Sequence, residues 1–316
     1  MVTLKLTLLD RTPLTDSISL FRFAPADGVE LPGYAAGAHV DFDMGAPGLR
    51  SYSLIDFVAP SGAPDTYTVA VQREDKGQGG SVAMHALTLG AQVSVSLPKN
   101  DFALHDGDAP AVLLAGGIGV TPIISFAAEL TRRGTEFSLH YATRSAAVSA
   151  FGDVLRDRFG AQLQQWHDDC TPIDLGQVIG SAPQGAHVYC CGPKGMIDAV
   201  RAQCETLGIP GDHVHFELFA TPQAQSGDQP FEVEISSTGQ VFDIPADKTI
   251  VDVLEEAGVD VMFDCQRGDC GICQTDVLEG EPDHRDVVLS DAERAAGNVM
   301  QICVSRAKSA RLVLDL

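Results

Sequence analysis

Four cysteines in the last quarter of the chain have the spacing of a metal-binding set. Cys265, Cys270 and Cys273 fall within nine positions, in the stretch DCQRGDCGICQTD, and Cys303 follows after 29 intervening residues. Thiolates are ligands both for zinc and for iron–sulfur clusters. The sequence therefore predicts that residues 264–276 form a metal-binding loop, with Cys303 as a remote fourth ligand.

The spacing C-x4-C-x2-C with one remote cysteine helps to distinguish an iron–sulfur cluster from a zinc site. Zinc sites usually combine two paired knuckles, each a short C-x2-C hairpin, whereas here three ligands share one loop. The spacing is that of plant-type [2Fe–2S] ferredoxins. Gly268 and Gly271 suit a loop around a cluster, because glycine adopts positive φ and lets N–H groups approach sulfur. The pattern favours an iron–sulfur cluster; a zinc site or four unrelated core thiols are the alternatives.

Three further stretches carry glycines of the kind that hold phosphate groups. KGQGGS (residues 76–81) precedes an expected helix, AGGIGVTP (115–122) joins an apolar strand to a helix, and YCCGPKGM (189–196) follows a later strand. Free N–H groups at a helix amino terminus bind anions. The second stretch lacks the G-x-G-x-x-G spacing of the general dinucleotide fingerprint. Taken alone, it could also be a tight strand-to-helix turn.

The stretch RSYSL, residues 50–54, could hold a flat aromatic ring on an expected strand. Arg50 can meet a phosphate or polarise a ring oxygen, Tyr52 offers a stacking surface, and Ser53 can donate a hydrogen bond to a ring nitrogen. An ordinary strand with a half-buried tyrosine would give the same pattern. The neighbouring stretches VAVQRE and KGQGGS favour the ring-binding interpretation.

The strands and helices that must position these residues fall into three regions. In the first hundred residues, short alternating runs separated by Gly, Pro and Asp turns predict an antiparallel barrel or sandwich. From about residue 110, apolar strands alternate with helices, which predicts an α/β domain with a doubly wound parallel sheet. We expect its first helix to be capped by Thr121 and ended by Gly134.

The third region follows a polar segment, residues 223–230, whose composition is typical of a linker. Beyond it we expect a hairpin with its turn at Thr238 and Gly239, and a helix with Thr249 as cap and Gly258 as stop. The cysteine loop and a final strand, RLVLDL, complete the chain. The predicted domains are therefore residues 1–104, 105–222 and 231–316.

The acidity of the chain limits its partners. Its formal net charge is −22, which argues against nucleic-acid binding, because phosphate contacts need a basic face. Residues 229–316 hold 18 acidic and seven basic side chains, a net charge of −11. No signal peptide or long apolar run is present, so we expect a cytoplasmic protein with no membrane segment and no disulfide framework. His39, His85, His105 and His140 lack ligand spacing and are expected to be surface or core histidines.

Together, these motifs resemble two known groups of proteins. R-x-Y-S, G-G-x-G-x-T-P and C-G-P are similar to the flavin and pyridine-nucleotide motifs of the ferredoxin–NADP reductase superfamily, and residues 229–316 resemble a plant-type ferredoxin. With GAHVDF, LPKNDFAL, HFELF, DHRDVVLS and CVSRAKSA, the whole chain resembles the phthalate dioxygenase reductase family. The resemblance implies an antiparallel β-barrel domain that binds FMN, an NAD-binding α/β domain with a doubly wound parallel sheet, and an α+β ferredoxin domain of β-grasp type.

The resemblance also implies which residues meet each cofactor. Cys265, Cys270, Cys273 and Cys303 would ligate the [2Fe–2S] cluster. Ser53, Cys191 and Glu217 would be catalytic residues beside the flavin, although Glu217 could instead be a solvated carboxylate at a strand end. The flavin and the nicotinamide nucleotide would be held by Arg50, Ser51, Tyr52, Ser53, Ala70, Val71, Gln72, Gly79, Gly80, Ser81, Gly116, Gly117, Gly119, Thr121, Arg144, Cys191, Gly192, Pro193 and Phe219.

The activity implied is that of an NADH-dependent reductase in an aromatic-ring oxygenase or O-demethylase system. A hydride would pass from NADH to FMN, and single electrons would pass through the cluster to a Rieske-type terminal oxygenase. We expect a monomer whose acidic ferredoxin domain steers a transient complex, with Asp264, Asp269 and Asp276 flanking the cysteine loop. A cytochrome P450 is an alternative acceptor. In a further alternative, residues 1–228 are a degenerate scaffold and the ferredoxin is only an electron carrier.

A preference for NADH over NADPH is expected from the turns after two strands of the α/β domain. Asp168 and Asp169 follow one strand and would repel a 2′-phosphate. Arg144 follows the neighbouring strand and would attract one, so it argues in the opposite direction.

Overall fold

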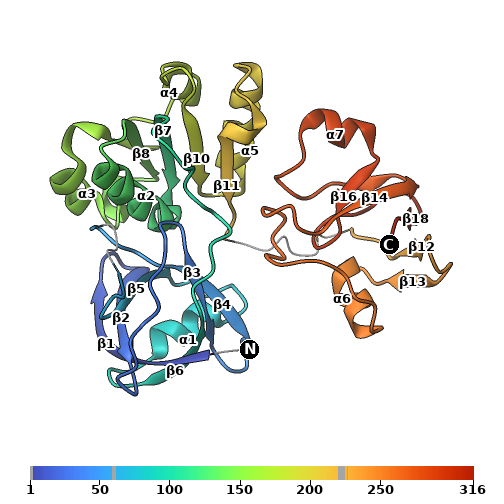
Figure 1. Ribbon diagram of the computed structural model, residues 1–316, viewed down its shortest axis with the longest axis horizontal. Helices are drawn as coiled ribbons and strands as arrows, with labels where there is room; N and C mark the ends of the chain where they lie inside the picture. The colour runs from blue at the N-terminus through green and yellow to red at the C-terminus, as the bar shows by residue number, and fades with distance from the viewer. Residues whose placement is uncertain (1–2, 59–61, 220–224, 226) are drawn as a thin grey trace. The chain divides into compact units, whose positions relative to one another are not determined.

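Two compact units make up the chain (Figure 1). The computed structural model describes residues 3–58, 62–219, 225 and 227–316. The first unit is Met1–His215 and the second is Phe216–Leu316. The described part of the first unit holds a six-stranded sheet and nearly all of a five-stranded sheet, whose last strand, Val214–Glu217, continues two residues into the second unit. Most of the buried side chains of each sheet belong to a separate core cluster.

The amino-terminal part of the first unit is a six-stranded antiparallel sheet. In sheet order its strands are β4 (Leu49–Ser53), β3 (His39–Asp43), β6 (Gln92–Ser96), β1 (Thr3–Pro13), β2 (Ile18–Pro25) and β5 (Tyr67–Gln72). A hydrogen bond of 2.9 Å from the Ile55 N–H to the Thr68 carbonyl joins the chain after β4 to β5. Alternate residues such as Phe21 and Phe23 enter the core, as the two-residue period requires. The predicted antiparallel β domain is confirmed.

The second sheet of this unit is the predicted parallel one. Its order is β11 (Val214–Glu217), β10 (His187–Cys191), β7 (Ala111–Gly116), β8 (Phe137–Thr143) and β9 (Leu163–His167), and the pairs β10–β7, β7–β8 and β8–β9 are parallel. Every residue of β7 is buried, as expected for a strand covered on both faces. The sheet is accompanied by α2 (Val120–Arg133), α3 (Gly152–Phe159), α4 (Leu175–Gly180) and α5 (Lys194–Thr206).

Helix α2 differs from the prediction at its start and agrees with it at its end. Its N-cap is Gly119, and Thr121 is the second helical residue, so the predicted capping role of Thr121 is wrong. The Thr121 hydroxyl instead donates a 3.1 Å hydrogen bond to the Ile118 carbonyl. At the other end, Gly134 has φ of +70° and ends the helix in the left-handed conformation, as predicted. Short 3-10 helices flank the longer elements at Gly117–Gly119, Ala146–Val148, Gly160–Gln162 and Gly211–His213.

Four histidines of the first unit lie together beside β10. The ring centroids of His105 and His187 are 4.0 Å apart, and those of His187 and His213 are 4.2 Å apart. His187 Nδ1 lies 2.9 Å from His215 Nε2, and the Tyr189 hydroxyl lies 3.0 Å from His105 Nδ1. Parallel stacking at this spacing favours neutral rings. His105 is thus a partly buried packing residue, as the sequence predicts for it.

The second unit is an α+β fold built on a five-stranded sheet. The sheet order is β13 (Val241–Ile244), β12 (Phe231–Ile235), β18 (Arg311–Leu314), β14 (Gln274–Glu279) and β16 (Val299–Gln301). β12 and β18 are parallel, and β15 (Pro282–Asp283) pairs with β17 (Arg306–Ala307). None of the helices in the described part of the chain has the length and apolar character that a bilayer-crossing segment requires.

The two α-helices of the second unit both begin with capping boxes. In α6 (Ile250–Glu256), Thr249 and Asp252 cap reciprocally, which confirms Thr249 as the cap, and Gly258 just beyond the helix has φ of +77°. Helix α7 (Asp291–Ala296) was not expected from the sequence. It is capped in the same way by Ser290 and Glu293.

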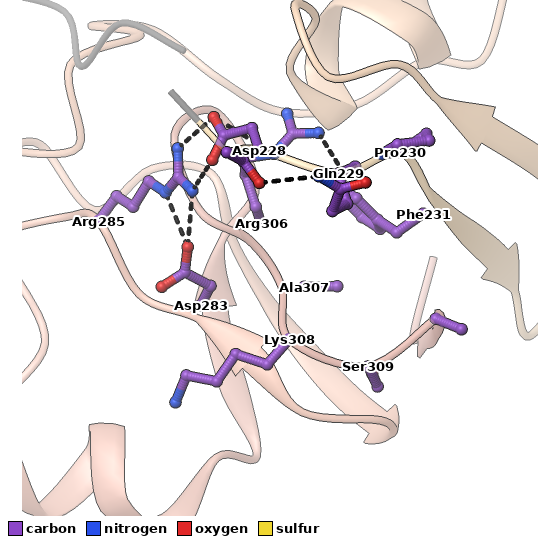
Figure 2. A pocket seen from close by; sticks show the side chains of 12 residues that line it. Asp228, Gln229, Pro230, Phe231, Asp283, Arg285, Arg306, Ala307, Lys308 and Ser309 are labelled. Carbon is purple, nitrogen blue, oxygen red and sulfur yellow. Dashed lines mark hydrogen bonds and ion pairs between the residues drawn. The ribbon is translucent and has the colours of Figure 1, made fainter. Parts of the chain in front are cut away.

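The predicted linker, residues 223–230, lies partly outside the described residues. Residues 223, 224 and 226 are not described, but residues 227–230 are, and they lie against the second unit (Figure 2). They line a pocket of about 450 Å³ together with residues of β17 and the β15 region. The carboxyl half of the predicted linker is therefore part of the second unit.

Candidate functional site

Arg50 and the start of helix α1 (Gly80–Ala86) form the first part of the site. Arg50 lies on β4, and its guanidinium donates a 2.9 Å hydrogen bond to the Gln78 side chain. A Cβ atom on Gly80 would come within 2.5 Å of the Arg50 side chain, so only glycine leaves room here. Gly79 has φ of +85°, a conformation that favours glycine. A cationic side chain thus lies over a glycine turn, a combination that suits a phosphate group.

The other residues of the R-x-Y-S stretch alternate between the two faces of β4. Ser51 donates a 2.6 Å hydrogen bond to Asp41, which also pairs with Lys99 at 3.0 Å. Tyr52 packs edge-on against Phe42, and burial raises the pKa of Tyr52 to about 12. Ser53 is buried. The hydroxyl of Ser51 is therefore committed to Asp41, whereas Tyr52 keeps a partly exposed ring that can stack.

Strand β5 carries Ala70, Val71 and Gln72. Ala70 and Val71 are buried, and the Val71 carbonyl accepts a 2.9 Å hydrogen bond from His85. Ser81 accepts a 3.0 Å hydrogen bond from the Glu74 N–H, so its hydroxyl fixes the loop ahead of α1. His85, expected from the sequence to be a surface or core histidine, is buried and joins α1 to the strand that carries the predicted ring contacts.

Two glycine loops meet at the carboxyl ends of neighbouring strands β7 and β10. A Cβ atom on Gly119 would lie 2.2 Å from the Cys191 carbonyl oxygen, and one on Gly116 would lie 2.7 Å from Pro193 Cδ. Gly192 is equally close, because its Cβ would lie 3.1 Å from Gly116 Cα. In a parallel α/β sheet this edge is where ligands bind. The absence of side chains at these three glycines therefore lets the two loops pack against each other at the edge where a nucleotide would bind.

The glycine loop after β7 also reaches the antiparallel sheet. The 3-10 helix that contains Gly117 lies against β5. Ser125 of α2 accepts a 3.1 Å hydrogen bond from the Asp56 N–H and donates one of 2.9 Å to the Leu54 carbonyl. Ser125 thus joins the nucleotide-side helix to the chain that follows R-x-Y-S, and sequence patterns did not single it out.

The turns after β8 and β9 are joined by backbone hydrogen bonds. The Asp168 N–H donates to the Thr143 carbonyl at 3.0 Å, and the Asp169 N–H donates to the Arg144 carbonyl at 3.3 Å. Arg144, Asp168 and Asp169 are all exposed. The structure therefore brings together the cation and the two carboxylates that were expected to govern the choice between NADH and NADPH.

Glu217 is the last residue of β11, the strand next to β10. It is only 3% exposed, so the alternative of a solvated carboxylate is wrong. Phe219, two residues further on, is 42% exposed. Cys191 is buried at the end of β10.

The cysteine loop of the second unit has the backbone that a wrapped loop needs. Gly268 and Gly271 have φ of +81° and +77°, and Gln266 has φ of +50°, the one positive value at a non-glycine residue among those described. The Arg267 N–H points at Cys265 Sγ, 3.3 Å away, and Cys273 Sγ lies 3.4 Å from the Gln301 side-chain oxygen. N–H groups directed at sulfur are a feature of iron–sulfur sites.

The four thiols form a chain of contacts: Cys270 contacts Cys265, Cys265 contacts Cys303, and Cys303 contacts Cys273. Contacts with Cys270 and Cys303 lower the pKa of Cys265, and the same contacts raise the pKa of Cys270 and of Cys303. The contact with Cys303 also lowers the pKa of Cys273. No group of three or more His, Cys, Asp or Glu among the described residues is arranged around a single metal ion. A two-iron cluster is larger than one ion, since each iron takes two of the four thiolates. The donor set and the loop therefore fit a [2Fe–2S] cluster better than zinc.

Asp269 does not have the position that its place in the loop suggested. Its side chain is 4% exposed, lies 3.4 Å from Arg267, and accepts a 2.7 Å hydrogen bond from the Leu218 N–H. Burial raises the pKa of Asp269 to about 7. The expectation that Asp269 contributes an exposed charge to a docking face is wrong, whereas Asp264 and Asp276 are exposed.

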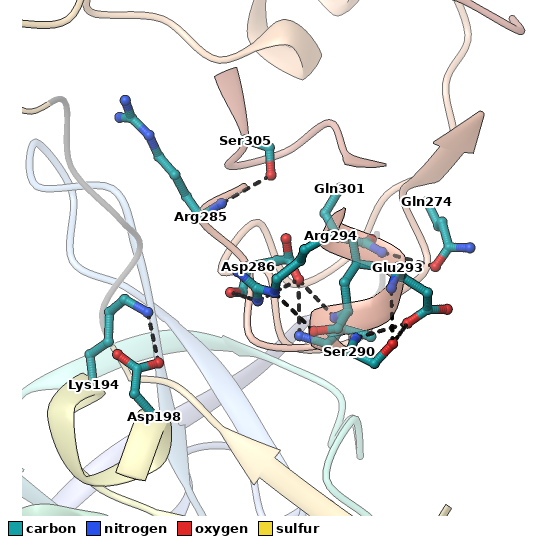
Figure 3. Close-up of polar contacts among 12 residues, drawn as sticks. Lys194, Asp198, Gln274, Arg285, Asp286, Ser290, Glu293, Arg294, Gln301 and Ser305 are labelled. Carbon is teal, nitrogen blue, oxygen red and sulfur yellow. Dashed lines mark hydrogen bonds and ion pairs between the residues drawn. The ribbon is translucent and has the colours of Figure 1, made fainter. Parts of the chain in front are cut away.

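A polar network around Asp286 is bonded to the cysteine loop; Figure 3 shows its contacts with Arg294. Asp286 is fully buried and accepts hydrogen bonds from the Leu289 N–H at 2.9 Å and from Arg294 at 3.2 Å. The Val287 N–H donates a 2.9 Å hydrogen bond to the Gly268 carbonyl, so this segment is bonded directly to the cysteine loop. The stretch DHRDVVLS, which contains Asp286 and Val287, contributes to the family resemblance, but its residue pattern alone does not predict this supporting role.

Comparisons with known proteins agree with this arrangement. The family described as "2Fe-2S iron-sulfur cluster binding domain" matches residues 233–308. The chain is 43% identical over 305 residues to phenoxybenzoate dioxygenase subunit beta of Ectopseudomonas oleovorans, which spans 95% of this chain and 93% of that protein.

Two solved structures extend the comparison to the fold. The structure of phthalate dioxygenase reductase, described as modular for electron transfer from pyridine nucleotides to [2Fe-2S], has 37% identity and a TM-score of 0.71 over 99% of this chain and 98% of that one. Full-length CYP116B46 from Tepidiphilus thermophilus has 35% identity and a TM-score of 0.79 over 100% of this chain and 42% of that one.

The sequence identity extends over almost the whole length of the chain. Together with the paired glycine loops, the three-cysteine loop and Cys303, it establishes the relationship. The chain belongs to the phthalate dioxygenase reductase family of flavin and iron–sulfur oxidoreductases.

Proposed function

We propose that the protein oxidises NADH with the help of bound FMN and delivers electrons singly, through a [2Fe–2S] cluster, to a Rieske-type terminal oxygenase. The observation that carries this proposal is the presence in one chain of two features. One is the pair of glycine loops around Gly119 and Cys191, and the other is a three-cysteine loop whose thiols are linked by contacts to one another through Cys303. The first arrangement suits a nucleotide and the second a cluster. A ferredoxin that acts alone would have no use for the paired glycine loops.

On the flavin side, the residues of β4 and α1 would bind and orient the cofactor. When bound, the flavin supplies the exchange between two-electron and one-electron transfer. Arg50 would neutralise its phosphate over the Gly79–Gly80 turn, and Tyr52 would stack beside it. Ser53, which is 5% exposed, would hold a ring nitrogen through its hydroxyl in a place shielded from water.

On the nicotinamide side, the backbone would do most of the binding. Gly116, Gly119 and Gly192 let the two loops pack closely against each other, so their backbone groups would face a phosphate and a flat ring together, and Cys191 borders them without a long side chain. Glu217, buried on the neighbouring strand, would place a carboxylate near the reacting ring. The thiolates of Cys265, Cys270, Cys273 and Cys303 would hold the cluster.

The identity of the flavin can be tested directly. The glycine turn below Arg50 suits a phosphate group, and the family to which the chain belongs favours a flavin mononucleotide there. We therefore expect FMN. Mass spectrometry of the flavin released from purified protein checks this, and FAD at stoichiometric occupancy would refute it.

The acceptor is proposed to be an oxygenase with a basic docking face. Residues 229–316 carry a net charge of −11, and Asp264 and Asp276 beside the cysteine loop are exposed. Opposite charges steer a transient complex, so electron transfer should slow as the Debye length falls from about 30 Å at 0.01 M salt to about 8 Å at 0.15 M. Stopped-flow transfer to an oxygenase across this range is the test. A flat salt dependence would leave the acidic residues without a role in docking.

A cytochrome P450 is the second candidate acceptor. It is favoured by the likeness, over the whole of this chain, to part of CYP116B46. Turnover with purified Rieske oxygenases and P450s, measured side by side with NADH, distinguishes the two. We further propose a monomer, which size-exclusion chromatography with light scattering tests. We also propose a cytoplasmic location, since no disulfide joins any of the eight cysteines.

A further inference from the structure

Asp228 lies in the segment that the sequence assigns to a linker, yet its carboxylate is held by the second unit (Figure 2). Both Arg285 NH groups donate to it, at 2.9 Å and 2.6 Å, in a two-pronged geometry. The Gln225 N–H adds a 2.8 Å hydrogen bond. Paired bonds between a guanidinium and a carboxylate are among the strongest and most directional in proteins.

The pair is buried and surrounded by further polar contacts. The Asp228 side chain is 7% exposed and that of Arg285 is 12% exposed. Hydrogen bonds from Arg285 lower the pKa of Asp228 to about 2, so the carboxylate is charged at neutral pH. Arg285 also pairs with Asp283 at 2.7 Å. A spacer that only joined two domains would not need a buried, fully paired charge.

A second arginine fixes the residues that follow Asp228. Arg306 donates to the carbonyls of Gln229, Pro245 and Lys248 at 3.2, 2.9 and 2.8 Å, and its guanidinium lies 5.0 Å from the centre of the Phe231 ring. Residues 228–231 are thus fixed at two successive points.

Arg285 connects this anchor to the segment behind the cysteine loop. Its backbone N–H donates a 3.2 Å hydrogen bond to the hydroxyl of Ser305 (Figure 3). Ser305 follows Cys303 by two residues. The next residue, Asp286, lies so close to Gly268 that a Cβ there would be 3.0 Å from Asp286 Cα. Any shift of Arg285 is therefore transmitted to residues that touch the loop between Cys265 and Cys270.

We propose that Asp228 is a positioning residue for the iron–sulfur cluster, acting through Arg285 to hold residues 285–288 against the cysteine loop. This inference rests on the proposed function, because it requires that the loop hold a cluster. Asp228 precedes residues 233–308, which match the cluster-binding family, so the cluster domain depends on a residue outside the matched segment.

The test is the loss of cluster from the full-length protein under an iron chelator, followed by visible absorbance and visible circular dichroism. Asp228→Asn should lose its cluster at least about tenfold faster than the wild type, because removing one partner from a buried ion pair is strongly destabilising. It should also change the visible dichroism of the cluster. Asp260→Asn, the same substitution at an exposed carboxylate of the same unit, is the control and should behave as the wild type.

A double-mutant cycle shows whether Asp228 acts through Arg285. Arg285→Gln alone and the double variant Asp228→Asn/Arg285→Gln should lose the cluster at similar rates, because the two changes remove one interaction. Asp228→Glu, which keeps the charge, should restore part of the retention. NADH oxidation with ferricyanide, which requires only the flavin, should be unchanged in every variant.

Each other outcome separates the inference from the proposed function. If the wild-type protein takes up no cluster, the proposed function is wrong. If the wild type holds a cluster and Asp228→Asn retains it as Asp260→Asn does, the positioning role is wrong. Equal loss of far-ultraviolet dichroism and cluster in Asp228→Asn would also overturn it, since Asp228 would then support the whole unit and not the loop.

Discussion

Gly268 and Gly271 lie in the same loop, with nearly the same backbone conformation, but have different surroundings. Both have φ near +80°, where an alanine costs about 1–2 kcal/mol. A Cβ on Gly268 would come within 2.6 Å of Val304 Cγ2 and 3.0 Å of Asp286 Cα, whereas one on Gly271 would meet only Val288 at 3.4 Å. Overpacking of this kind adds about 1–3 kcal/mol. We therefore expect Gly268→Ala to lower the free energy of unfolding by about 2–5 kcal/mol and Gly271→Ala by about 1–2 kcal/mol.

The assay is urea unfolding of the cluster-loaded protein, monitored by visible circular dichroism. The midpoint for Gly268→Ala should lie well below that of Gly271→Ala, which should lie slightly below that of the wild type. NADH oxidation with ferricyanide controls for the first unit. If the two alanine variants lose equal stability, or Gly271→Ala loses more, the contact with Val304 and Asp286 does not restrict the loop.

Three further outcomes are expected. Cys270→Ser should abolish cluster absorbance but keep NADH oxidation with ferricyanide, and loss of the flavin as well would contradict separate cofactor units. The kcat/KM for NADH should exceed that for NADPH, because the carboxylates of Asp168 and Asp169 should repel a 2′-phosphate more strongly than Arg144 attracts it; comparable values would refute this. Burial lowers the pKa of His187 and His215 from 6.5 to about 4, so the folded state binds fewer protons than the unfolded chain between these values. Stability should therefore fall as pH drops from about 6.5 to about 4, and urea midpoints of the first unit that do not change over this window would contradict the neutral stack.

Local sequence signals predicted helices well where caps and periodicity agreed. Thr249 begins α6 and Gly134 ends α2 as expected, because each residue type satisfies the backbone at that position. The predicted cap, Thr121, is instead the second residue of the helix, and its hydroxyl donates a hydrogen bond to the Ile118 carbonyl. Helix α7 was missed although Ser290 and Glu293 have the spacing of a capping box, because it has only six residues.

Site residues were predictable from the sequence where residue type and spacing alone indicate their role. They were not predictable where the role depends on whether a side chain is buried. The glycines around Gly119 and the cysteines of the loop could be identified from residue type and spacing. Asp269 and Asp228 could not, because nothing in a sequence separates an exposed carboxylate from one that is folded inward onto an arginine or an N–H group. In the sequence, Arg267 is only two residues from its partner Asp269, whereas Arg285 is 57 residues from its partner Asp228.

The position of β18 affects how this protein is made. It is the last strand of the second unit along the chain, yet it lies in the middle of the sheet, between β12 and β14. Arg311, the first residue of β18, is 38 residues beyond Cys273, so the ribosome adds it roughly 2–8 seconds after Cys273. Until then the sheet cannot close, and the thiols on its loop are exposed to oxidants and to stray metal ions. The order of the strands along the chain therefore means that all four thiols are made before the sheet that supports their loop is complete.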